Sequence, residues 1–183
     1  KLFGTYDGIT RGLIFCSRKD EARSLSLIFN ERGFKTISLT GESSESDRID
    51  AINRIETDND DERIDYIFTV DIFNEGIDIP KINQVIMLRP TQSAIIFVQQ
   101  LGRGLRKVDG KDYLTVIDFI GNYNNNYLIP IALYGDKSYN KDTIRKLIVT
   151  GNEMIPGSST VNFDRISRER IFKSIDNTNL QTK

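Results

Sequence analysis

The sequence predicts an α/β fold, in which a parallel sheet carries helices on both faces and a small, mainly helical extension follows. Short apolar runs alternate with segments of helical period over the first part of the chain. The alternation ends near Asp118, where an asparagine-rich run begins. Strands that alternate with helices pair in parallel, because each crossover returns the chain to the same end of the sheet. Such sheets bind ligands at the carboxyl ends of their strands, so the loops that follow the strands are the candidate site.

Five short apolar runs are the expected strands, because each is short for a helix and ends at polar turn residues. They cover residues 13–16, 36–39, 66–70, 85–88 and 113–117. The loops that follow the first four of them start at Ser17, Thr40, Asp71 and Arg89. We therefore expect these loops to gather at one edge of the sheet.

Three segments of helical period connect these strands. The first has Ser17 as its expected cap and Gly33 as its stop. The second starts with Ser44 and Asp47, and the third follows Pro90. The apolar positions expected on their buried faces are Ala22, Leu25, Ile28 and Phe29, then Ile49, Ile52 and Ile55, then Ala94, Phe97, Val98 and Leu101.

The change of pattern predicts a domain over residues 1–120 and an extension over residues 121–183, to which the sequence assigns no chemistry. Two helical patterns lie in the extension, and a short strand is expected at residues 161–163. The apolar positions of these helices are Ile144, Leu147 and Ile148, then Ile166, Ile171 and Ile175. In the first domain, the acidic loop at residues 58–62 is expected to be a solvated connection.

Composition excludes several classes of function. The 183 residues are 38% hydrophobic and 28% charged, which is typical of a soluble globular protein. The chain has no histidine, and this removes Ser-His-Asp triads, histidine metal sites and histidine general bases. The lone Cys16 lies in an apolar run and is expected to be a buried thiol. Because the net charge is −1, any contact with nucleic acid must come from local basic patches. The chain has no apolar run long enough to predict a membrane span, and we expect a cytoplasmic protein.

The most informative motif is Q-x-x-G-R-x-x-R at residues 99–106. Arg103 and Arg106 lie three residues apart beside two glycines. Arginine keeps its charge, and its planar fork of donors fits phosphate oxygens. Such a pair suits the negative charge that spreads over a phosphoryl group during transfer. The alternative interpretation is a solvated basic end of a helix.

Four segments, in this order, resemble the motifs of the second RecA-like domain of superfamily 2 helicases, over about residues 12–119. They are residues 12–17, 39–41, 69–80 and 99–106. The run E-G-I-D-I-P at 75–80 and the run R-P-T-x-S at 89–93 are similar to the type III restriction and excision-repair branch, which acts mostly on duplex DNA. The extension resembles the segment that follows the helicase core in some bacterial proteins, which implies a prokaryotic source.

The resemblance implies a role for each candidate site residue. Arg103 and Arg106 would act as arginine fingers on the γ-phosphate of ATP held by a neighbouring domain. Nucleotide contacts are expected from Gly76, Asp78 and Gln99, and contacts with the nucleic-acid backbone from Ser17, Arg18, Thr40, Gly41 and Thr69. No metal site is expected in this chain. The alternatives are a turn glycine for Gly76, a turn-capping carboxylate for Asp78 and plain helix capping for Ser17.

The chain has no G-x-x-x-x-G-K-[ST] phosphate loop, and no Asp-Glu pair of the magnesium-binding kind follows a strand. In the family both belong to the first RecA-like domain, which would hold ATP with Mg²⁺. The resemblance thus implies the second motor lobe of an ATP-dependent DNA helicase or translocase, inactive as an isolated chain. The implied partners are nucleic acid, with DNA favoured over RNA, and the N-terminal RecA-like domain of the same polypeptide, with no membrane.

Two other functions compete with this one. A non-catalytic nucleic-acid or protein-binding module would keep the same fold, although the two arginines and Asp78 argue against a lost site. A nucleotide-cofactor enzyme with a Rossmann-like sheet is disfavoured, because Gly102 and Gly104 follow a helical pattern rather than a strand.

Overall fold

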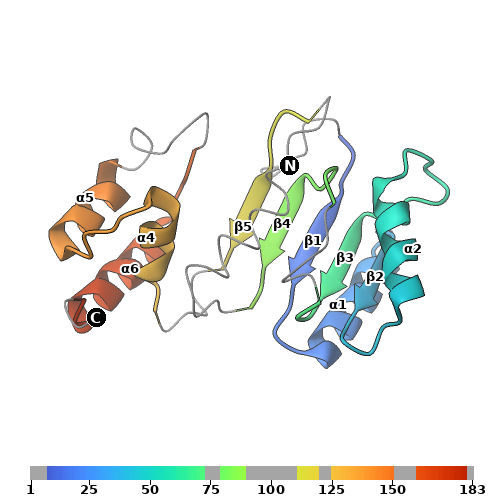
Figure 1. Ribbon diagram of the computed structural model, residues 1–183, viewed down its shortest axis with the longest axis horizontal. Coiled ribbons are helices and arrows are strands. Elements are labelled where there is room, and N and C mark those ends of the chain that lie inside the picture. The colour runs from blue at the N-terminus through green and yellow to red at the C-terminus, as the bar shows by residue number, and fades with distance from the viewer. Residues whose placement is uncertain (1–7, 73–78, 90–110, 120–124, 151–159, 181–183) are drawn as a thin grey trace. The chain divides into compact units, whose positions relative to one another are not determined.

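The computed structural model describes residues 8–72, 79–89, 111–119, 125–150 and 160–180 (Figure 1). The described residues form two compact units, one built on residues 8–72, 79–89 and 111–119, the other on residues 125–150 and 160–180. The predicted domain boundary between residues 120 and 121 stays a prediction.

The first unit contains a sheet of five parallel strands in the order β2-β3-β1-β4-β5 (Figure 1). The strands are β1 (Gly12–Phe15), β2 (Thr36–Leu39), β3 (Tyr66–Thr69), β4 (Gln84–Met87) and β5 (Thr115–Asp118). Every neighbouring pair is parallel, which confirms the predicted α/β class. The observed bounds differ from the predicted strands by at most two residues. The last residues of all five strands share one row of the register, so the strands end at a common edge.

Helix α1 (Lys19–Glu31) covers one face of this sheet. Alternate side chains of the central strands, Ile14 and Cys16 from β1 and its end, and Tyr66 and Phe68 from β3, pack in one cluster with Ala22 of the helix. Ile28 was expected in this interface, yet 41% of it is exposed. A helix turns about 100° per residue, which places Ile28 on the flank of the face that Ala22 occupies.

Helix α2 (Glu45–Glu56) contacts β2 and β3. The connections through α1 and α2 run in opposite directions along the sheet, so right-handed crossovers place the two helices on opposite faces. The predicted start is confirmed: Ser44 Oγ accepts from the Asp47 N–H at 3.1 Å, and Asp47 Oδ2 accepts from the Ser44 N–H at 3.0 Å. Ile49 was expected on the buried face but is 52% exposed, because it lies about 160° around the helix from buried Ala51.

Tyr66 crosses the sheet surface at the amino ends of the strands. Its ring lies over Gly12, where an added Cβ would be only 2.3 Å from a ring carbon. Its hydroxyl donates to Gln84 Oε1 at 2.7 Å, so one side chain links β3 to β4 across β1. Glycine at position 12 therefore permits this contact, since any side chain there would occupy the space of the ring.

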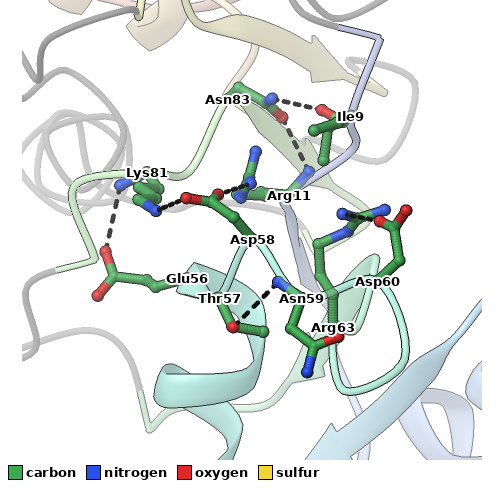
Figure 2. A network of polar contacts seen from close by, with 10 residues as sticks. All are labelled: Ile9, Arg11, Glu56, Thr57, Asp58, Asn59, Asp60, Arg63, Lys81 and Asn83. Atoms are coloured by element: carbon green, nitrogen blue, oxygen red, sulfur yellow. Dashed lines mark hydrogen bonds and ion pairs between the residues drawn. The ribbon is translucent and has the colours of Figure 1, made fainter.

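A polar network joins the segments that lead into β1 and β4 to the acidic loop after α2 (Figure 2). Arg11 is 3% exposed, and its Nη2 donates to Asp58 Oδ1 at 2.7 Å, while Lys81 Nζ donates to Asp58 Oδ2 at 2.9 Å. Buried Asn83 accepts from the Arg11 N–H at 3.0 Å and donates to the Ile9 carbonyl at 2.7 Å. The loop at 58–62 is thus more than the solvated connection that the sequence predicted, because Asp58 ties two entry segments together.

The second unit is helical in its described part, as predicted. Its helices are α4 (Leu128–Tyr134), α5 (Lys141–Thr150) and α6 (Arg165–Asn177). Helix α5 contacts both others, and Lys141 Nζ donates to the Asp176 carbonyl of α6 at 3.0 Å. Helix α4 was not predicted, because Pro130 interrupts a short apolar run whose period is not helical. The strand expected at residues 161–163 is absent, and buried Phe163 lies in an irregular segment before α6.

Candidate site at the carboxyl ends of the strands

The predicted site residues fall into two groups in the structure. Ser17, Arg18, Thr40, Gly41 and Thr69 are described. The proposed nucleotide contacts, Gly76, Asp78, Gln99, Arg103 and Arg106, lie outside the described residues. The described part of the candidate site is therefore the edge of the sheet at the ends of β1, β2 and β3.

Backbone pairing brings these three strand ends together. Phe15 is in register with Thr69, and Thr69 is in register with Leu39. Just beyond the strands, the Cys16 N–H donates to the Thr69 carbonyl at 2.9 Å. The Val70 N–H in turn donates to the Leu39 carbonyl at 3.3 Å. The loops starting at residues 17, 40 and 71 thus leave the sheet at the same edge, as the sequence predicted.

Ser17 and Arg18 occupy the exposed loop between β1 and α1. The residue that caps the helix is Arg18, in extended conformation, and the prediction of Ser17 as the cap is wrong. The carboxylate of Glu21, in the first turn of the helix, accepts from the Ser17 N–H through its Oε2 at 2.9 Å, and Arg18 itself makes no side-chain capping hydrogen bond. The Arg18 side chain is 74% exposed, with its Nε 3.6 Å from Asp20 Oδ1. Its guanidinium is thus free to reach a phosphate at a small electrostatic cost.

Thr40 and Gly41 form a tight turn after β2. The Thr40 N–H donates to Ser43 Oγ at 3.0 Å, and Thr40 Oγ1 accepts from the Glu42 N–H at 3.3 Å. Thr40 is buried, so its hydroxyl holds the turn. Gly41 is exposed, and a Cβ added there would meet no heavy atom within 4 Å. The open side of this turn is therefore the backbone at Gly41.

Thr69 is the last residue of β3 and is 0% exposed. Its Oγ1 is buried and has no hydrogen-bond partner. A side chain in this position offers no surface to a phosphate, so the predicted contact of Thr69 stays a prediction without support from the geometry.

Two charged groups of this edge were missed by the sequence interpretation. The first links α1 to the turn after β2: Lys19 Nζ is 2.7 Å from Glu42 Oε1, and Arg23 Nη2 is 2.7 Å from Glu42 Oε2. The hydrogen bond from Lys19, then that from Arg23, lowers the pKa of the Glu42 carboxyl. The spacing of Lys19 and Arg23, one helical turn apart at the start of a predicted helix, could have indicated a basic pair. Their partner Glu42 lies far along the chain, so the sequence did not indicate the contact.

The second group is an ion pair across the end of β1. Arg89 follows β4, and Asp71 follows β3. Arg89 Nη1 lies 2.5 Å from Asp71 Oδ1. Asp71 has a φ of 60°, a left-handed conformation that aspartate tolerates better than most residues. Arg89 also donates its backbone N–H to the Phe15 carbonyl at 3.1 Å. In sequence, Asp71 and Arg89 stand just before the two segments that carry the predicted nucleotide contacts.

Cys16 is buried under this edge, as predicted. Burial, followed by the charge of Glu21, raises the pKa of its thiol to about 12. The group is therefore a neutral thiol at physiological pH and supplies no nucleophile.

The described residues contain no group of three His, Cys, Asp or Glu side chains that could hold a metal ion. None of the described helices is long and apolar enough to span a bilayer.

The fold and the loops at the strand ends define the class of this chain. It is an α/β domain of the RecA-like kind, with loops that leave the sheet at the carboxyl edge of its parallel strands. The model of the helicase conserved C-terminal domain matches residues 3–108, which is more than half of the chain. The chain therefore belongs to the helicase C-terminal domain family.

Similar proteins agree with this family. The chain is 30% identical over 126 residues to IRC3 of Saccharomyces cerevisiae, named as an ATP-dependent helicase, covering 69% of this chain and 18% of that protein. It is 28% identical over 173 residues to the ATP-dependent RNA helicase DRS1 of Candida glabrata, covering 93% of this chain and 21% of that protein. The chain thus spans about a fifth of the length of these relatives. The yeast DEAD-box splicing factor Prp28 shares the fold, with a TM-score of 0.58 and 16% identity over 94% of this chain and 32% of the other.

Proposed function

We propose that this chain is the second motor lobe of an ATP-dependent helicase or translocase. Its membership in the helicase C-terminal domain family supports this proposal, as do the ATP-dependent helicase names of its relatives. The structural observation that supports it most strongly is the common edge of β1, β2 and β3. These strands are buried and in register, and the loops that follow them carry exposed hydrogen-bond donors. Loops positioned in this way by a rigid sheet are suited to binding.

On the nucleotide side, we propose that Arg103 and Arg106 stabilise the charge that develops during phosphoryl transfer. Gly76, Asp78 and Gln99 would complete the contacts with the nucleotide. The sequence has no phosphate loop, so the bulk of ATP binding, together with Mg²⁺, is assigned to a first RecA-like lobe. The paired Asp71 and Arg89 would hold the start of both contributing segments in place.

On the nucleic-acid side, we propose that Ser17, Arg18 and Gly41 contact the phosphate backbone. The first two lie on an exposed loop, and Gly41 offers an open backbone. Thr40 supports this surface indirectly, because its side chain holds the turn that presents Gly41. With a chain net charge of −1, binding should be weak, independent of sequence and sensitive to salt. DNA is our preferred substrate because of the likeness at residues 75–80 and 89–93, although several relatives, DRS1 among them, are named RNA helicases.

ATP hydrolysis by a protein that joins this chain to a first RecA-like lobe tests the proposal. We expect DNA to stimulate hydrolysis, and we expect the isolated chain to show no turnover. RNA of the same sequence, in a parallel assay, decides the preference between the two nucleic acids. A joined protein that binds nucleic acid but never hydrolyses ATP would favour a non-catalytic binding module instead.

A further inference from the structure

Glu42 holds two cations of the proposed nucleic-acid edge at once. Each of its oxygens takes one of them, Oε1 from Lys19 Nζ and Oε2 from Arg23 Nη2, both at 2.7 Å. The two cations project from adjacent turns of α1, and the carboxylate comes from the turn after β2. One anion thus links α1, which follows Ser17 and Arg18, to the turn that contains Gly41.

This arrangement fits a phosphate as well as it fits a carboxylate. A phosphodiester also presents two charged oxygens, and lysine and arginine both bind it through short charge-assisted hydrogen bonds. The three side chains are 47%, 56% and 60% exposed for Lys19, Arg23 and Glu42, so an incoming strand can reach them. Exposed ion pairs contribute little to stability, and exchanging one anion for another is therefore inexpensive for the fold.

The surrounding charges make Glu42 decisive for the potential of this edge. Arg18 is balanced by Asp20, and Glu21 lies over the start of α1. With Glu42 in place, the three cations Arg18, Lys19 and Arg23 are matched in number by the three carboxylates Asp20, Glu21 and Glu42. Removal of Glu42 leaves a net positive charge beside Ser17 and Gly41.

We infer that Glu42 occupies the position of a nucleic-acid phosphate, and that the backbone displaces it to bind Lys19 and Arg23. This inference rests on the proposed nucleic-acid role of the edge and adds two contacts that the sequence interpretation missed. On this inference, competition from Glu42 keeps the binding of nucleic acid weak and reversible.

The test compares the intact 183-residue chain with Glu42→Gln, using labelled DNA and RNA oligonucleotides of about 12 nucleotides and the same sequence. We expect Glu42→Gln to bind about three- to tenfold more tightly at about 50 mM salt, with a smaller gain at about 300 mM. Adding Arg23→Gln to Glu42→Gln should abolish most of that gain. The matched control is Glu62→Gln, which makes the same charge change in the exposed loop before β3, at the opposite edge of the sheet.

The outcomes separate the two proposals. An unchanged affinity in Glu42→Gln, with measurable binding by the parent chain, overturns the inference and leaves the proposed function intact. An equal gain in Glu62→Gln also overturns it, because net charge alone would then explain the effect. If neither the parent nor Glu42→Gln binds either oligonucleotide, while both melt at the same temperature, the nucleic-acid role of this edge is wrong and the inference falls with it. A selective gain for one oligonucleotide supports the inference and identifies the preferred backbone.

Discussion

Replacing Gly12 by alanine should destabilise the first unit through one side chain, Tyr66. The new Cβ would lie 2.3 and 2.4 Å from two ring carbons, whereas carbon atoms pack comfortably at about 3.5–4.0 Å. The ring must therefore move by about 1 Å. Phe29 and Phe34 limit that movement, because their ring centroids lie 5.7 and 5.9 Å from that of Tyr66.

The expected loss follows from three contributions. Overpacking of a core side chain costs about 1–3 kcal/mol. Displacing the Tyr66 hydroxyl from Gln84, which it contacts at 2.7 Å, costs about another 1 kcal/mol. Alanine returns about 0.4–1 kcal/mol by restricting the unfolded chain. Gly12→Ala should therefore lower the free energy of unfolding by about 1–3.5 kcal/mol.

Equilibrium unfolding in urea, followed by circular dichroism, measures this loss. Gly41→Ala is the matched control, because its Cβ would meet no heavy atom within 4 Å, and its stability should change by no more than about 0.5 kcal/mol. Tyr66→Phe separates the hydrogen bond from the steric contact, since it keeps the ring. If Gly12→Ala proves as stable as Gly41→Ala, the packing of Tyr66 over β1 is wrong.

Two further predictions concern buried groups. Cys16 should react with a thiol reagent at pH 8 only after denaturant unfolds the chain. Because the pKa of its thiol rises from 9.0 to about 12 on folding, the free energy of unfolding should fall as the pH rises between those two values. Rapid labelling of the folded chain would contradict both statements. Asn83→Ala should lower the free energy of unfolding by about 1–3 kcal/mol, because the Arg11 N–H loses its buried acceptor. Asn59→Ala, in the exposed loop, should be nearly neutral in the same urea titration. Equal effects of the two substitutions would refute the role of Asn83 as a buried hydrogen-bond partner.

Local patterns were sufficient to predict the sheet and the start of α2. Strands buried on both faces leave continuous apolar runs, and the Ser44–Asp47 cap is encoded within one turn. Two apolar residues that were expected on buried helix faces are exposed for a common reason. Ile28 and Ile49 are apolar residues at flanking positions, and only the tertiary packing decides which arc of a helix meets the sheet.

The edge at which the strands end was predicted from the sequence, whereas the side-chain pairs across that edge were not. Strand ends can be read from sequence, so the loops at Ser17 and Thr40 were found. The pairs Lys19–Glu42 and Asp71–Arg89 join residues that are far apart along the chain, and a single sequence contains no record of such contacts. The cap of α1 was misplaced by one residue because Arg18 occupies the position without a side-chain hydrogen bond, so no capping side chain marks it in the sequence.

The most direct test of the central claim is the effect of Arg103→Ala and Arg106→Ala on ATP hydrolysis by a protein that carries both lobes. An arginine finger acts on charge that develops in the transition state, so each variant should reduce kcat by about 10³-fold or more with much smaller changes in ATP affinity. Lysine at either position should restore little, because a point charge lacks the planar fork. The melting temperature serves as the control for folding. If both alanine variants fold and hydrolyse ATP at the parent rate, this chain does not supply the catalytic arginines of a helicase motor.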